Sequence, residues 1–184
     1  MKIIALVNPG MEELCKQEIQ KILTVSGKVY PHIVEFEASV EQALTLLYHG
    51  QSMRRIIVSL GKYKNIDDID FNSVHWEDFI SHSSFKVEVE NVKGMDARLA
   101  IAKKVAGKVF ATVDKQKLSL ALDLKKPDFL LIAYFNGEEY IIGVDIAGEE
   151  LHSRAYRVFT HSASCKGDLG YYFARKTGYL SGNN

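Results

Sequence analysis

The sequence predicts an α+β protein of two domains, and three observations lead to this prediction. The chain has 184 residues, which suits one domain or two small ones at about 150 residues per domain. Strand-like and helix-like patterns alternate through residues 1–61, and a second series of strands surrounds a long helical pattern at 95–111. A polar stretch at 64–70 separates the two series and is the best candidate for a linker.

The first domain is expected over residues 1–63. Short apolar runs predict strands, and apolar residues at helical spacing predict two amphipathic helices, the second capped by Ser39. The predicted elements are a strand at 3–7, a helix at 11–23, strands at 29–30 and 33–36, a helix at 40–48 and a strand at 56–60. This order is that of the ferredoxin-like, or split β-α-β, arrangement.

The remaining chain is expected to hold a linker with a short helix at 64–84, a second domain at 85–157 and a connector at 158–184. Within the second domain, residues 85–89 alternate between apolar and charged side chains, which predicts a half-buried strand. Asn136-Gly137 is a strong hairpin signal. The predicted elements are strands at 85–89, 118–124, 129–135 and 140–146 around the helix at 95–111.

The net charge of zero is the sum of two opposite regions. Residues 1–80 carry 8 basic and 11 acidic side chains, whereas residues 81–184 carry 15 and 12. The basic excess is strongest over residues 93–126, where nine Lys or Arg stand against three Asp. A lysine-rich helix face is usually only solvated. A basic cluster inside a neutral protein also suits contact with phosphate groups.

Composition excludes several classes of protein. Cys15 and Cys165 are the two cysteines, and no Cys-x-x-Cys occurs, which argues against a disulfide framework or a four-ligand zinc site. No apolar run approaches the roughly 18 residues of a membrane helix. The apolar start of the chain ends too early, at Asn8-Pro9-Gly10, for a signal peptide. We therefore expect a cytoplasmic protein without a membrane partner.

Motifs for catalysis and for cofactor binding are missing from the sequence. No Gly-x-Gly, no glycine-rich loop ending in Gly-Lys-Ser/Thr and no His-Glu-x-x-His occurs, and the six histidines are scattered. Ser162 and Ser164 lie near His161, but nothing indicates an exposed nucleophile with an oriented base. We predict no catalytic, cofactor-binding or metal-binding residue in this chain.

Two short pieces carry a family resemblance: residues 122–128 read LDLKKPD, and residues 151–157 read LHSRAYR. Together with the strand at 85–89 and the helix at 97–110, they resemble the THUMP domain, an RNA-binding module of enzymes that modify tRNA and rRNA. The family usually has Gly between the Arg and the Tyr of the second piece, where this chain has Ala155. A ferredoxin-like domain commonly precedes THUMP, so the resemblance extends over almost the whole chain.

The run HSASCKGDLGYYFARKTGY at 161–179 is similar to the connector of guanine-N2 methyltransferases. The resemblance implies the RNA-binding N-terminal half of an S-adenosylmethionine-dependent tRNA or rRNA methyltransferase, which positions the acceptor end of tRNA. The catalytic Rossmann-like domain is expected in cis after residue 184. Its Asn/Asp-Pro-Pro-aromatic motif does not occur here, because the three prolines are never adjacent. S-adenosylmethionine is expected for that parent enzyme and no cofactor for this chain.

The basic run and the resemblance together indicate candidate RNA-binding residues. Lysine and arginine bind phosphates, and aromatic rings stack on unpaired bases. Tyr156 is the candidate for stacking, although core packing would explain it as well. The candidate phosphate contacts are Lys104, Lys108, Lys125, Lys126, Arg154 and Arg157.

Two other functions stay open at this point. A stand-alone RNA-binding adaptor, presenting tRNA to a separate enzyme, would contain the same two domains, although it needs no extension after Arg157. A ferredoxin-like regulatory module for a small molecule is the third hypothesis. It would show no salt-dependent affinity for RNA, which a phosphate-binding protein must show.

Overall fold

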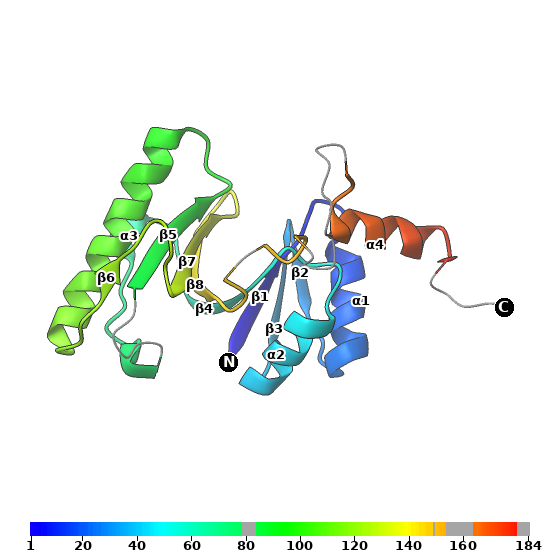
Figure 1. Ribbon diagram of the computed structural model, residues 1–184, viewed down its shortest axis with the longest axis horizontal. Helices are drawn as coiled ribbons and strands as arrows, with labels where there is room; N and C mark the ends of the chain where they lie inside the picture. The colour runs from blue at the N-terminus through cyan, green and yellow to red at the C-terminus, as the bar shows by residue number, and fades with distance from the viewer. Residues whose placement is uncertain (79–83, 149, 154–163, 180–184) are drawn as a thin grey trace. The chain divides into compact units, whose positions relative to one another are not determined.

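The computed structural model describes residues 1–78, 84–148, 150–153 and 164–179. The chain divides into two compact units, and Figure 1 labels their elements. Unit 1 combines Met1–Ile57 with Glu149–Asn184, and unit 2 is Val58–Gly148. Both contain strands and helices, so the predicted α+β class is confirmed.

Unit 1 follows the predicted order of elements and adds a C-terminal helix. Its strand order is β2-β3-β1-β4, with β3 antiparallel to both β1 and β2. Helix α1 packs against α2 and against β2 and β3. The elements are β1 (Lys2–Leu6), α1 (Glu12–Leu23), β2 (Lys28–Tyr30), β3 (Ile33–Glu37), α2 (Val40–His49), the start of β4 (Arg55–Tyr63) and α4 (Gly167–Lys176).

Two buried carboxylates hold unit 1 together. Glu18 of α1 accepts hydrogen bonds from the backbone of Gln51 and from the backbone and hydroxyl of Ser52, just before β4. Asp168, which is fully buried at the start of α4, accepts a bond of 2.6 Å from the Asn8 amide. Buried charges need such partners. These bonds therefore fix α1 to the start of β4 and fix α4 to the loop after β1.

Burial also raises the pKa of two groups beside Glu18. It raises the pKa of the Cys15 thiol to about 12 and, with the Glu18 charge adding to the effect, the pKa of Tyr171 to about 12. Both side chains are thus neutral at physiological pH. Cys15 behaves as a small buried apolar residue, which is the usual role of an inert structural cysteine.

Unit 2 forms the strand order β4-β8-β7-β5-β6. Strand β5 is parallel to both β6 and β7, whereas β7 and β8 form an antiparallel hairpin. The elements are the end of β4, two 3₁₀ turns η1 (Ile66–Asp68) and η2 (Trp76–Asp78), β5 (Ser84–Glu90), α3 (Met95–Lys115), β6 (Ala121–Leu122), β7 (Phe129–Phe135) and β8 (Tyr140–Asp145).

One hydrophobic core lies between α3 and the sheet of unit 2. Val105 and Val109 of α3 are fully buried in the same cluster as Phe85 of β5, whose ring packs edge-on against that of Phe110. The segment before β5 joins this core through Trp76, which is fully buried and packs edge-on against Phe71. The segment expected to be a linker is therefore, over its described residues 64–78, a packed part of unit 2.

The strand predicted at 118–124 is shorter than expected. Ala121 and Leu122 are the residues in register with β5, and the strand ends after them because the Asp123 carboxylate accepts the backbone N–H groups of Lys125 and Lys126 and turns the chain. Leu118 and Leu120 still pack on the core, while Leu122 and Leu124 are exposed. The Asn136-Gly137 hairpin forms as predicted, with Gly137 at φ 104° and the Asn136 side chain accepting two backbone N–H groups.

Two glycine substitutions test the packing of unit 2. Gly143 of β8 faces β4 so closely that a Cβ atom there would overlap the carbonyl oxygen of Val58. We expect Gly143→Ala to lower the free energy of unfolding by about 1–3 kcal/mol, as overpacked sites do. Gly107, inside α3, has nothing within 4 Å of such a Cβ, so Gly107→Ala should raise it by about 0.5–1 kcal/mol. Urea unfolding of both variants measures this, and a neutral Gly143→Ala would contradict the packing described.

Candidate nucleic-acid interface

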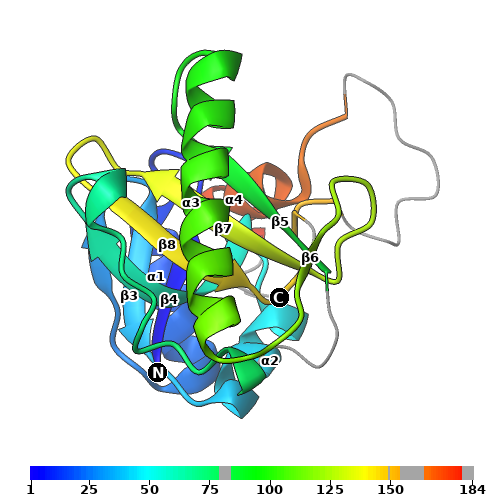
Figure 2. The same ribbon diagram turned by 90° about the vertical axis from the view of Figure 1, so that its left-hand side faces the viewer.

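Helix α3 provides the basic surface of unit 2. It runs for 21 residues from Met95 and contains no proline, and the positive φ of 87° at the preceding Gly94 lets the chain turn into the helix. Three valines, Ala106 and Thr112 form its buried stripe at helical spacing, so the lysines between them face outward. Figure 2 shows the first turns of α3 extending past the end of the sheet. Lys93, just before the helix, and Arg98 and Lys103 within it are all exposed.

An acidic segment lies along one side of α3. We call residues 66–72 the acidic strap, because they include Asp67, Asp68 and Asp70. Three apolar side chains of the strap, those of Ile66, Ile69 and Phe71, are buried in the core beneath α3. The strap is thereby fixed in place, with its carboxylates at the surface.

The strap binds the lysines on its side of the helix. The ammonium nitrogen of Lys104 lies 2.9 and 3.0 Å from the two carboxylate oxygens of Asp67. Lys108 donates to the backbone oxygen of Asp67 at 2.7 Å, and Lys115 donates to Asn72 at 3.4 Å. The hydrogen bond and the charge of Lys104 hold the pKa of Asp67 below its usual value. This carboxylate is therefore ionised at neutral pH.

A cavity of about 350 Å³ lies between the strap and α3. Its walls carry the charged side chains of Asp68, Asp70, Lys108 and Lys115. Small-molecule pockets are mostly apolar with a few polar groups. A charged lining of this kind suits water and ions better than a small organic molecule. This cavity therefore gives little support to the hypothesis of a small-molecule regulator.

The loop 123–128 presents two further lysines in a different way. Its backbone is held at both ends by carboxylates: Asp123 accepts the N–H groups of Lys125 and Lys126 at 2.8 and 3.0 Å, and Asp128 accepts the N–H and hydroxyl of Ser84 at 2.7 and 2.8 Å. These bonds lower the pKa of both carboxyls. Both carboxylates bond to backbone and serine donors and so hold the loop in place, and the side chains of Lys125 and Lys126 are exposed.

The predicted site residues therefore fall into three groups. Lys104 and Lys108 lie on the side of α3 that the strap covers, and Lys125 and Lys126 lie on the loop between β6 and β7. The other three candidates, Arg154, Tyr156 and Arg157, lie outside the described residues. Their assignment to RNA contact remains a prediction.

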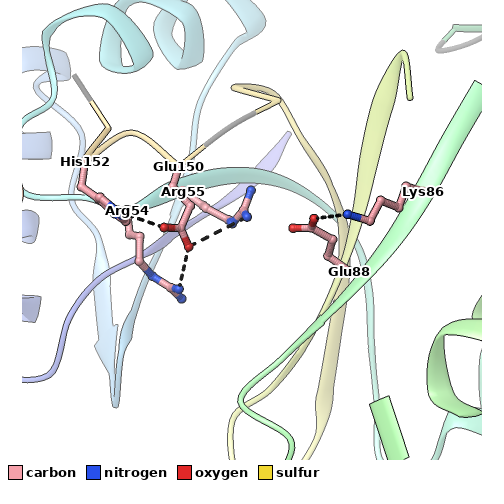
Figure 3. Close-up of polar contacts among 6 residues, drawn as sticks. All are labelled: Arg54, Arg55, Lys86, Glu88, Glu150 and His152. Atoms are coloured by element: carbon pink, nitrogen blue, oxygen red, sulfur yellow. Dashed lines mark hydrogen bonds and ion pairs between the residues drawn. The ribbon is translucent and has the colours of Figure 1, made fainter. Parts of the chain in front are cut away.

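Sequence reasoning missed the residue that controls the first group, Asp67. The run of acidic residues around Asp67 suggested a solvated linker. In the structure, however, Asp67 forms an ion pair with Lys104 of the neighbouring helix α3. The sequence did contain a sign of this: the apolar residues Ile66, Ile69 and Phe71 stand among the aspartates, which is typical of a segment that packs on a core. Lys86 of β5 is similarly neutralised, at 2.7 Å from Glu88 on the same strand (Figure 3).

A second polar cluster belongs to unit 1, where the chain returns to it after unit 2. Glu150 lies between two arginines of the β4 start, at 3.3 Å from Arg54 and 4.0 Å from Arg55, and at 3.1 Å from the His152 ring (Figure 3). The backbone N–H of Leu151 donates to the Arg54 carbonyl at 2.8 Å. The cluster therefore fastens the returning segment to β4.

Metal and membrane sites receive no support in the described part of the chain. It contains no group of three or more His, Cys, Asp or Glu side chains placed to hold a metal ion. None of its helices combines the length and the apolar composition that crossing a membrane requires.

No protein-family model matches the chain. Its fold is similar to that of a predicted N6-adenine-specific DNA methylase from Listeria monocytogenes, with a TM-score of 0.76 and 21% identity over 95% of this chain and 47% of that one. It is also similar to SMU.472, a methyltransferase candidate complexed with SAH, with a TM-score of 0.73 and 18% identity over 100% of this chain and 49% of that one.

A third similar structure is a 4-thiouridine synthetase in complex with RNA and ATP, with a TM-score of 0.51 and 14% identity over 78% of this chain and 40% of that one. At these identities the likeness concerns the fold. The chain spans about half the length of the two methylase structures. A similar fold thus forms part of the longer chains of a predicted DNA methylase, a methyltransferase candidate and a 4-thiouridine synthetase.

The His152 cluster makes the stability of unit 1 depend on pH. Burial lowers the pKa of His152 below 6.5, helped by the charges of Lys166 and Arg54 and opposed by those of Glu150 and Asp168. Because the unfolded chain then binds the proton more readily, acidification favours unfolding. We expect the free energy of unfolding to fall as the pH is lowered from 7.5 to about 5.5. The fall should be smaller in His152→Gln, whose amide still offers Glu150 a hydrogen-bond donor. Urea titrations at the two pH values test this; equal losses in both proteins would refute it.

Proposed function

We propose that residues 85–157 form a THUMP-type RNA-binding module, and that the chain is the RNA-positioning half of an RNA guanine-N2 methyltransferase. The observation that carries the proposal is the loop 123–128. There the LDLKKPD piece uses its two aspartates to order the backbone, which leaves Lys125 and Lys126 exposed for phosphates. An ordered loop binds with less loss of conformational freedom than a mobile one.

The chemistry of these lysines suits RNA. Structured RNA is recognised largely by its phosphates, its ribose hydroxyls and its unpaired bases. Lys125 and Lys126 would bind phosphates directly. Lys104 and Lys108 would first have to break their bonds to the strap. Arg154 and Arg157 are proposed as further phosphate contacts, and Tyr156 as a platform for an unpaired base of the acceptor end of tRNA.

The comparisons support the larger proposal of a methyltransferase. Two of the similar structures are a methylase and a methyltransferase candidate by name, one of them holding SAH, and this chain spans about half of each. S-adenosylmethionine would be bound by a catalytic domain in cis, because the present sequence lacks a glycine-rich motif for it. The role of this chain is then to bind the acceptor end of tRNA and orient it.

A double substitution on the loop tests the proposal. We expect Lys125→Ala with Lys126→Ala to weaken binding of tRNA and to reduce the slope of log affinity against log salt by about two, since each phosphate contact contributes about one. Filter binding at several salt concentrations measures both quantities. A DNA hairpin of the same stem sequence provides the comparison for RNA specificity.

The matched control removes two exposed lysines of unit 1, by Lys21→Ala with Lys28→Ala. This variant loses the same charge and should keep most of the affinity and salt slope. If the loop variant and the control behaved alike, the loop would not be the phosphate site. If the wild-type chain showed no salt-dependent binding of tRNA at all, RNA binding itself would be refuted.

A further inference from the structure

We propose that Asp67 limits the affinity of unit 2 for RNA, because its carboxylate occupies Lys104 in the place that a phosphate would take. The inference rests on the proposed function and adds a restraint to it. Both carboxylate oxygens of Asp67 lie within 3.0 Å of the Lys104 ammonium group. Carboxylate and phosphate oxygens make the same kind of charge-assisted bond with lysine, so the two compete for this side chain.

The strap cannot leave α3 as a whole. Ile66, Ile69 and Phe71 are buried in the core of unit 2, and the Phe71 ring packs against Trp76 with centroids 5.6 Å apart. Lys108 additionally holds the backbone oxygen of Asp67. RNA can therefore gain Lys104 only if that side chain rotates away from Asp67, while the strap stays in place.

The pair is exposed enough for such an exchange. The side chains of Lys104 and Asp67 are 55% and 74% exposed, and ion pairs of this kind are weak and readily broken. After the exchange, however, Asp67 would remain close to the bound phosphate without its partner. Its negative charge would repel the RNA backbone over a distance of about 8–10 Å at moderate salt.

The repulsion from Asp67 lowers the affinity of any RNA that uses Lys104, whatever the base sequence of that RNA. An RNA that contacts only this side of α3 would gain little, because taking Lys104 leaves the Asp67 carboxylate without its partner beside the phosphate. An RNA that also contacts the loop 123–128 would retain the affinity of Lys125 and Lys126. Repulsion placed against unwanted partners is a general way to obtain specificity. We infer that the strap favours RNAs that engage both surfaces over RNAs bound by charge alone.

The variant Asp67→Asn tests this inference, with Asp68→Asn as its matched control. Asp68 carries the same charge at the next position, but its carboxylate bonds to the Asn65 amide, at 3.0 Å. At low salt we expect Asp67→Asn to raise the affinity for tRNA about two- to five-fold, the range set by a surface ion pair. Asp68→Asn should produce a smaller rise. The difference between the variants should shrink at high salt.

A double-mutant cycle identifies the mechanism. In a Lys104→Ala background, Asp67→Asn should produce no more gain than Asp68→Asn, because the lysine that it would release is missing. Equal gains from Asp67→Asn and Asp68→Asn in the natural background would overturn the inference, and so would a full gain in the absence of Lys104.

If wild-type protein bound tRNA with the loop-dependent salt slope while Asp67→Asn changed nothing, the inference alone would fail. If wild-type protein did not bind tRNA, the proposed function would fail with it.

Discussion

The parallel pairing of β5 with β7 and β6 is the constraint on which unit 2 depends. Parallel strands cannot be joined by a tight turn, so the chain must cross the sheet between them, and α3 makes that crossing. The helix can stay on the sheet only by burying one stripe, which directs its lysines away from the core. The stacked rings of Phe85 and Phe129, with centroids 5.9 Å apart, lie where β5 and β7 begin.

Acidic residues of the strap offset part of the charge of this basic helix. One side of α3 is covered by the strap, whose apolar residues complete the core and whose Asp67 bonds to Lys104 and Lys108. The loop 123–128 has no such cover, and its aspartates bond to backbone and to Ser84. An anion can therefore bind most easily where the lysines are not already paired with carboxylates. The number of lysines matters less.

Local patterns predicted most of the fold. The alternation of residues 85–89 and the Asn136-Gly137 turn depend on neighbours in sequence, and both appear as expected. The end of β6 did not follow its leucine alternation, because the two backbone N–H groups that the Asp123 side chain accepts turn the chain there. The partnership of Asp67 with Lys104, 37 positions apart, could not be predicted at all. Exposed charges have no periodicity that is specific to their partners, so only the tertiary fold brings such residues together.

Lysine-acetylation footprinting with and without tRNA tests the central claim most directly, since it reads every exposed lysine in the intact chain. The account predicts that tRNA protects Lys125 and Lys126 strongly, protects Lys104 less because Asp67 competes for it, and leaves Lys21 and Lys28 of unit 1 reactive. Protection confined to unit 1, or equal reactivity of all lysines with and without tRNA, would contradict the assignment of unit 2 as the RNA-binding surface.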